Sequence, residues 1–139
     1  MRIKTEFISL STNGRTEMTD ITDAVAELLA RNGFTEGNVT LFVPGSTGAL
    51  TTIEYEPGLL RDYPEFFEKI IPSNVSYHHD ETWHDGNGHS HLRASLQGPS
   101  LTVPFAQGKL LLGTWQQIIF VDFDNRARNR KIVAQFIGE

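Results

Sequence analysis

Short apolar segments separated by turn residues fill the C-terminal part of the sequence, and they constrain its fold more than any other feature. β-Branched and aromatic side chains are concentrated in four such segments: residues 100–105, 109–112, 114–123 and 131–137. Residues 38–44 and 49–55 have the same character, and Asn13-Gly14 predicts a tight hairpin turn between two N-terminal strands. These signals predict a sheet-rich fold.

A few helices are expected between these strands. Residues 24–31 place apolar side chains on one helical face, which makes them the clearest helix. A second helix is predicted to begin at Pro57 and to be interrupted at Pro64, and residues 91–96 predict a short third one. Residues 73–88 are polar and predict a long functional loop. This order predicts an α+β fold with a largely antiparallel β-sandwich core and two or three short helices.

Composition limits both the architecture and the chemistry. A chain of 139 residues predicts one domain, spanning residues 1–139. The absence of cysteine excludes disulfides and thiolate metal sites, so His, Asp and Glu are the strong metal ligands available. The net charge of -5 argues against binding to nucleic acid or to an anionic membrane. The N-terminus has no apolar signal-like core, and we expect a cytoplasmic location.

All five histidines lie in one short polar stretch, which also holds Asp80 and Asp85: His78, His79, His84, His89 and His91. Imidazole and carboxylate groups are suitable ligands for a divalent ion, so this stretch predicts an open metal or acid–base site. His89 and His91 can share an ion if the backbone is extended, whereas a helix would place them about 200° apart. The hypothesis therefore requires a helix that begins no earlier than about Ser90. The alternatives are a solvated polar loop and a purely structural metal site.

Other polar residues are candidates for contacts with an anion. Strand alternation would place Arg126, Arg128 and Arg130 on one face, where guanidinium groups could hold phosphate oxygens. The alternative is an exposed sheet edge protected by charge. Glu54 follows apolar residues on its strand, and a carboxylate directed inward would require a metal, a cation or a proton.

Three motifs near the middle of the sequence are specific enough to indicate a family: HLRASLQGPSLTVP at residues 91–104, GKL at 108–110 and LGTWQQI at 112–118. Together they closely resemble the signature of the YjbQ family, a widespread group of uncharacterised proteins. The resemblance extends over almost the whole chain. It implies a small α+β domain that assembles as a homotrimer, and some family members are named as a secondary thiamine-phosphate synthase, a transferase activity.

The resemblance also implies a polar, metal-associated site. Two of its histidines match His79 and His91, and His89 matches a preceding histidine found in many members. A third family histidine is missing, because Gly45 stands where relatives have it. His84 or Glu54 would then substitute for it, or this chain has altered or lost the family's activity.

The leading hypothesis is a cytoplasmic, trimeric, enzyme-like protein that binds a divalent metal, zinc or magnesium, and acts on a small phosphorylated molecule. The expected metal ligands are His79, His89 and His91. The expected catalytic residues are Glu54, Asp80 and His91, and the expected substrate contacts are Thr47, Arg93, Gln116 and Arg128. The competing hypotheses are a non-catalytic trimer that binds a metal or a small anion, and an assembly protein.

Overall fold

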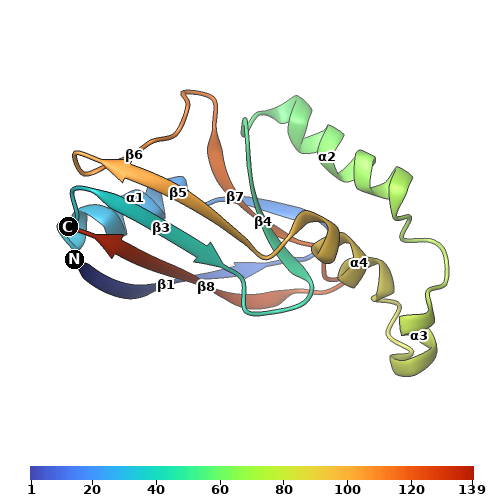
Figure 1. Ribbon diagram of the computed structural model, residues 1–139. Coiled ribbons are helices and arrows are strands. Elements are labelled where there is room, and N and C mark those ends of the chain that lie inside the picture. The colour runs from blue at the N-terminus through green and yellow to red at the C-terminus, as the bar shows by residue number, and fades with distance from the viewer.

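Two antiparallel sheets and four helices make up the computed structural model, which describes residues 1–139 (Figure 1). The larger sheet has five strands in the order β1 (Arg2–Thr12), β8 (Arg128–Gly138), β3 (Gly37–Phe42), β5 (Ser100–Ala106) and β6 (Lys109–Leu110). The smaller sheet has three strands in the order β2 (Glu17–Asp20), β7 (Gln117–Asp122) and β4 (Gly48–Ile53). The helices are α1 (Thr22–Arg31), α2 (Pro57–Ile70), α3 (His78–Trp83) and α4 (Gly88–Gln97). The α+β, largely antiparallel prediction is confirmed.

Strand β7 explains how the layers are arranged. Its side chains alternate, so that Ile118 and Phe120 belong to the core between the two sheets, while Ile119 and Val121 belong to a second core. Phe67 of α2 and Ala94 of α4 complete that second core. The smaller sheet is therefore covered on both faces, which is why β7 is apolar without polar alternation. The layers are the larger sheet, the smaller sheet and the helices α2 and α4.

The Asn13-Gly14 turn does not join two paired strands, so the hairpin prediction is wrong. β1 pairs with β8 along its whole length, from Arg2 opposite Gly138 to Thr12 opposite Arg128, whereas β2 pairs with β7 in the other sheet. The turn instead carries the chain from one sheet to the other. Gly14 has a φ of 74°, and a Cβ there would collide with the backbone oxygen of Asp124. The turn is thus packed directly against the β7–β8 connection.

The helical regions differ from expectation at α2, at α3 and at the start of α4, which is Gly88 and not residue 91. α2 runs unbroken through Pro64. The ring of Tyr63 stacks with that of Phe123, and Phe67 packs in the second core. α3 forms within the stretch predicted to be a loop, and the Tyr77 N–H donates to Asp80 Oδ2 at 3.1 Å at its start. None of the helices combines the length and the apolar composition that crossing a membrane requires.

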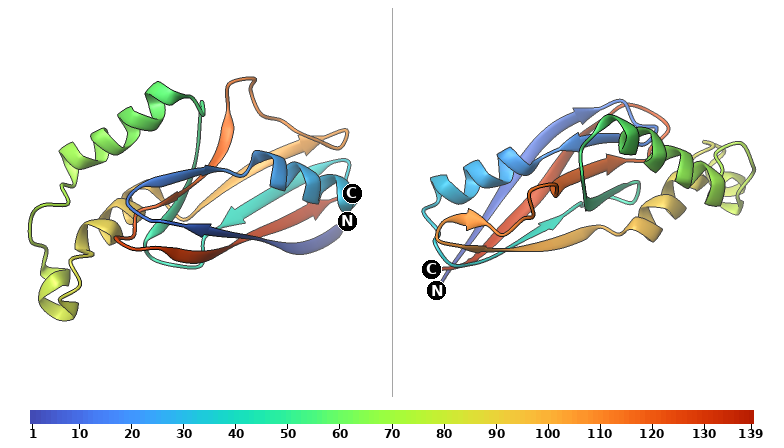
Figure 2. Two further views of the ribbon diagram at one scale, coloured as in Figure 1. Left: turned by 180° about the vertical axis from the view of Figure 1, so that it is seen from behind. Right: turned by 90° about the horizontal axis from the view of Figure 1, so that it is seen from above.

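The polar histidine stretch lies at the end of the molecule opposite the chain termini (Figure 2). At the termini, the Met1 ammonium group lies 2.6 Å from Glu139 Oε1. At the other end, α3 and the N-terminal end of α4 project beyond the sheets (Figures 1 and 2). The fold therefore presents α3 and the start of α4 at an open end of the molecule.

Candidate functional site

The segment between α3 and α4 is fixed by hydrogen bonds from two directions. On one side, the Asn125 side chain donates to Asp85 O at 2.8 Å and its backbone N–H donates to Asn87 Oδ1 at 3.1 Å. On the other side, Gly88 N donates to Asp80 Oδ1 at 3.1 Å. The β7–β8 turn and α3 therefore hold the start of α4 between them.

Gly88 allows this close approach of α3 and α4. A Cβ at this position would lie 2.6 Å from the Cβ of Tyr77 and 3.3 Å from Asp80 Oδ1. No side chain larger than hydrogen fits without moving the two helices apart. The local sequence thus brings residues of α3 next to residues of α4.

His79 and His91 meet at this crossing. Their ring centroids are 4.2 Å apart and the rings are inclined by 35°. His79 Nδ1 lies 3.6 Å from Asp85 Oδ1 and 3.9 Å from Asp80 Oδ1. That nitrogen is buried and has no hydrogen-bond partner, although buried polar atoms are normally paired. We call His79, Asp80 and Asp85 the His79 cluster, with the His91 ring stacked against it.

The donor atoms of the His79 cluster lie close to one another. One atom from each residue lies within 4.8 Å of the other two. An ion with bonds of about 2.0–2.2 Å to nitrogen and oxygen brings its ligand atoms to roughly 3–4 Å from one another, and both distances from His79 Nδ1 are in this range. One imidazole and two carboxylates, open to solvent at Asp85, can therefore hold a divalent ion.

The electrostatic state of these groups suits ligation. The hydrogen bond from the Tyr77 backbone holds the pKa of Asp80 below its ordinary value, so its carboxylate stays ionised. Burial lowers the pKa of His91, and the neighbouring His79 lowers it further. An ionised Asp80 carboxylate is the form that binds metal, and a neutral His91 ring adds no positive charge beside the cluster.

His89 does not join His79 and His91, which corrects the predicted three-histidine arrangement. α4 begins at Gly88, so residues 89 to 91 are helical and not extended. His89 therefore points about 200° away from His91 around the helix axis. It faces a separate polar pocket, and burial is the main cause that lowers its pKa.

The remaining predicted residues lie elsewhere. Glu54 is exposed between β4 and α2, so it does not face the core. Gln116 donates to Thr52 Oγ1 at 3.2 Å and lines a hollow of about 340 Å³ between β4 and β5.

Arg93 is buried, and its Nε and Nη2 donate to Ile71 O. Neither His84 nor Glu54 belongs to the group of possible metal ligands, which instead includes Asp85 beside His79.

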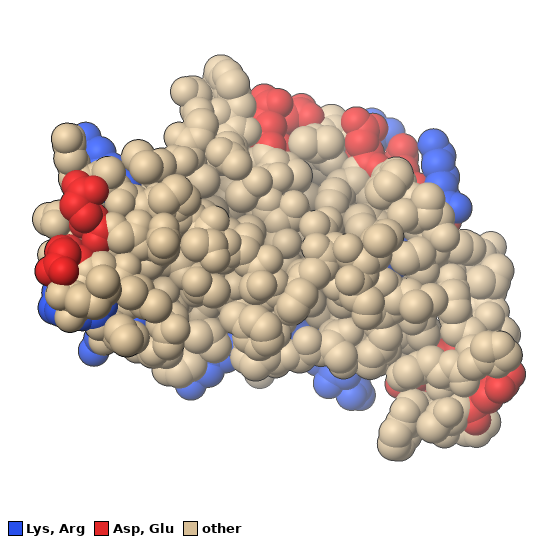
Figure 3. Space-filling view, in the orientation of Figure 1, with Lys and Arg blue, Asp and Glu red and all other residues tan.

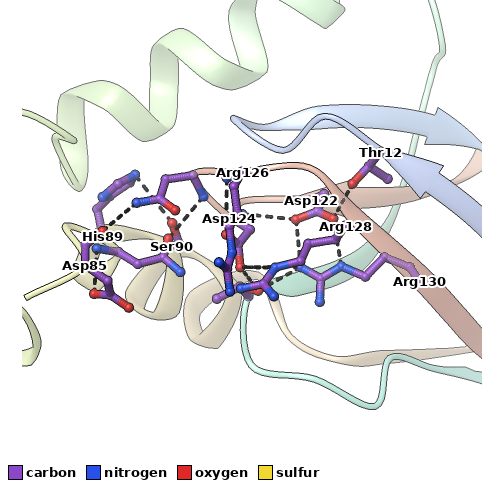
Figure 4. A network of polar contacts seen from close by, with 12 residues as sticks. Thr12, Asp85, His89, Ser90, Asp122, Asp124, Arg126, Arg128 and Arg130 are labelled. Atoms are coloured by element: carbon purple, nitrogen blue, oxygen red, sulfur yellow. Dashed lines mark hydrogen bonds and ion pairs between the residues drawn. The ribbon is translucent and has the colours of Figure 1, made fainter. Parts of the chain in front are cut away.

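Sequence reasoning did not identify a buried ionic network that links the site to the larger sheet (Figure 4). Arg130 donates to both carboxylate oxygens of Asp122, at 2.7 and 2.8 Å, and Asp122 is fully buried. Thr47 accepts a hydrogen bond from Arg130 at 2.7 Å and donates to Asp124 at 3.0 Å. Arg128 Nε donates to Asp124 at 3.1 Å. The sequence signal for this network is a pair of aspartates, Asp122 and Asp124, before the β7–β8 turn and a pair of arginines, Arg128 and Arg130, after it. Each pair has a spacing of two residues.

A hollow beside His91 borders this network at Gly45. The hollow has a volume of about 350 Å³ and is lined by His91 and by small residues, including Gly45, Ser46 and Ser95. A Cβ at Gly45 would lie 3.3 Å from Arg130 Nη1 and would meet nothing else within 4 Å. Gly45 thus leaves open space on one side of this hollow, and the same hollow is lined by His91.

Comparison with known proteins identifies the family. The pattern described as UPF0047 protein YjbQ-like matches residues 6–139. The chain belongs to the YjbQ family. Its YjbQ relatives include a UPF0047 protein of Archaeoglobus fulgidus, 43% identical over 91% of this chain and 96% of the relative. The UPF0047 protein YugU of Bacillus subtilis is 32% identical over 94% of this chain and 97% of YugU.

Solved structures of YjbQ proteins have the same fold. A hypothetical protein from Aeropyrum pernix K1 is 33% identical and superimposes with a TM-score of 0.90, covering 98% of this chain and 99% of the other. A YbjQ-like protein of unknown function from Sulfolobus solfataricus P2 is 31% identical, with a TM-score of 0.88 and coverage of 99% and 100%. The likeness confirms the fold and the family of this chain.

Proposed function

We propose that this YjbQ protein binds a divalent metal ion at the His79 cluster and presents it to a small phosphorylated molecule. The observation that carries the proposal is His79 Nδ1, a buried nitrogen without a hydrogen-bond partner that faces the carboxylates of Asp80 and Asp85. Leaving such an atom unpaired costs free energy, and a metal ion would satisfy it. The mixed nitrogen and oxygen donors favour zinc over magnesium, which prefers oxygen ligands and water.

Metal binding is tested by elemental analysis of protein that has been stripped with a chelator, reconstituted with zinc and desalted. We expect one ion per chain in the wild type, and loss of stoichiometric zinc in His79→Ala and Asp85→Asn. His91→Ala should weaken binding, because its ring packs against His79. The matched control is His78→Ala, since the His78 side chain is 98% exposed and outside the cluster. Full zinc occupancy in His79→Ala would show that the assigned ligands are wrong.

The finer proposal is a reaction on phosphorylated substrates. In formation of thiamine phosphate, the nitrogen of a thiazole phosphate bonds to the methylene carbon of the pyrimidine precursor, and pyrophosphate leaves that carbon. A bound divalent ion would offset the negative charge of the pyrophosphate. The family resemblance supports this reaction, and so does Arg128, which is held at Asp124 and keeps its Nη groups free of other protein partners.

The competing proposal is a binding protein without catalysis, and turnover separates the two. Purified zinc-loaded protein is incubated with both precursors, and thiamine phosphate is quantified. A catalytic role predicts product that falls at least about tenfold in His79→Ala and is retained in His78→Ala. Zinc occupancy without product would favour the binding protein, and equal turnover in His79→Ala would contradict a catalytic role for the cluster.

We also propose that the chain forms a homotrimer, as the family resemblance implies. The outer face of the larger sheet supports this, because no helix covers it and charged side chains are absent over β3 and β5 (Figure 3). It exposes the apolar side chains of Ile3, Phe7 and Phe42. Light scattering should give three times the chain mass of 15.6 kDa, and Phe42→Lys should lower the mass. A wild-type mass of one chain would contradict the proposal.

A further inference from the structure

A second polar pocket lies on the face of α4 that carries His89, away from His91. Its volume is about 280 Å³, near the lower end for small-molecule sites, and no large apolar side chain lines it. Five segments converge on it: the β1–β2 turn with Arg15 and Thr16, α2 with Glu68, the α2–α3 connection with Ser73, α4 with His89 and Arg93, and the β7–β8 turn with Asn125. We call it the Arg93 pocket.

Arg93 is a fixed cation in the wall of this pocket. Its side chain is only 5% exposed, and its Nη2 lies 2.9 Å from Glu68 Oε2. Glu68 also accepts hydrogen bonds from the backbone and hydroxyl groups of Ser73, so its negative charge is already shared among partners. Arg93 Nη1 has a single long contact, 3.3 Å to Thr16 Oγ1. Because Nη1 carries two hydrogens, donor capacity remains on the buried guanidinium group.

Arg15 adds a positive charge that no carboxylate balances. It is exposed, lines the pocket and makes no ion pair. Arg15 and Thr16 have φ angles of 56° and 65°, in a region that β-branched residues such as Thr rarely adopt. Such conformations persist where the surrounding structure enforces them and are concentrated at functional sites. Here the strained turn places both residues at the pocket.

We propose that the Arg93 pocket binds a phosphate group, either as free phosphate or as part of a small phosphorylated molecule. With Glu68 compensating Arg93, the charge of Arg15 leaves the pocket net positive. Arg15, the free Nη1 hydrogen of Arg93 and the second amide hydrogen of Asn125 are the donors; the first amide hydrogen goes to Asp85 O. Charge-assisted bonds from arginine are typical of phosphate sites. This inference is independent of metal binding at the His79 cluster.

The test is a titration with inorganic phosphate in zinc-free buffer containing a chelator, followed by NMR of the arginine Nε–H and asparagine amide signals. We expect saturable shifts at Arg15, Arg93 and Asn125, while sodium chloride at equal ionic strength leaves them in place. Arg15→Gln should raise the phosphate dissociation constant about tenfold, as expected for loss of a charge-assisted bond. Because Arg15 is exposed, the variant should fold, whereas replacement of the buried Arg93 would disturb packing.

Lys109→Gln is the matched control, since it removes the same charge from β6, outside the pocket, and should leave phosphate affinity within about twofold. Titration with glycerol 3-phosphate distinguishes the ligand source: tighter binding than phosphate indicates a phosphorylated molecule, and equal or weaker binding indicates free phosphate. The proposal is overturned if Arg15→Gln binds phosphate as tightly as the wild type. It is also overturned if chloride produces the same shifts.

Discussion

Asp122 and Arg130 form the most deeply buried ion pair of the molecule, at the edge of the candidate site. The Arg130 side chain is 13% exposed, and its hydrogen bonds to Asp122 hold the pKa of Arg130 above its ordinary value. For the neighbouring Asp124, burial would raise the pKa, but hydrogen bonds from Thr47 and Arg128 hold it below its ordinary value. The Asp124 carboxylate therefore stays charged, and the buried Arg130 depends on its carboxylate partner.

Removing the charge of Asp122 is expected to destabilise the protein strongly. Asp122→Asn removes the close counter-ion of buried Arg130 and leaves only Asp124, 3.9 Å from Arg130 Nη2. Breaking such a buried pair costs about 3–5 kcal/mol of the free energy of unfolding. Chemical denaturation measures it. Arg31→Ala is the control, because its pair with Glu6 is at the surface, with Arg31 66% exposed, and such pairs contribute less than about 1 kcal/mol. Equal losses in the two variants would contradict the assigned importance of burial.

The two histidines of α4 make stability depend on pH. Their pKa values are lowered in the folded state, so the unfolded chain takes up protons more readily once the pH falls below about 6.5. The free energy of unfolding should thus be highest above that pH and decrease from pH 7.5 to pH 5.5. His91→Gln should flatten this decrease, while His78→Gln, at an exposed position, should preserve it. An unchanged pH profile in His91→Gln would count against this cause.

The crossing of α3 and α4 is the element on which the His79 cluster depends. Gly88→Ala places a methyl group 2.6 Å from the Cβ of Tyr77, so the helices must separate. We expect a loss of about 1–3 kcal/mol in unfolding free energy, typical of overpacking, and weaker zinc binding because His79 moves. Denaturation and competition with a chelating dye measure the two effects. Gly113→Ala meets only ordinary contacts, at 3.7 and 3.8 Å, and should change neither.

The strands and helices also show which elements can be predicted from local sequence and which cannot. The two-residue alternation of apolar side chains and the content of β-branched residues located most strands, because both are typical of a half-buried pleated sheet. The Asn13-Gly14 signal failed because β1 pairs with β8, at the other end of the chain, and no local pattern encodes such a partner. α3 was missed because its six residues have no apolar face and none of them is buried.

At the scale of the whole molecule, β7 is the strand that both cores share. Ile118→Ala opens a cavity between the sheets and Ile119→Ala opens one under α2 and α4, since both residues are fully buried. Each should cost about 2–5 kcal/mol in denaturation experiments. Ile3→Ala, at a site 67% exposed, should cost much less. A small effect at either β7 position would contradict the three-layer arrangement.

By itself, the sequence determined the α+β class, the family and the polar stretch that carries the histidines, because composition, periodicity and motifs are local properties. Only the tertiary structure decided which of these residues meet. The start of α4 at Gly88 sends His91 to His79 and His89 to the Arg93 pocket. The β7–β8 turn brings Asp122 and Arg130, eight residues apart, together across the two sheets, and long-range packing brings Arg15 near Arg93. Contacts between distant segments depend on how layers stack, and spacing along the chain does not report that.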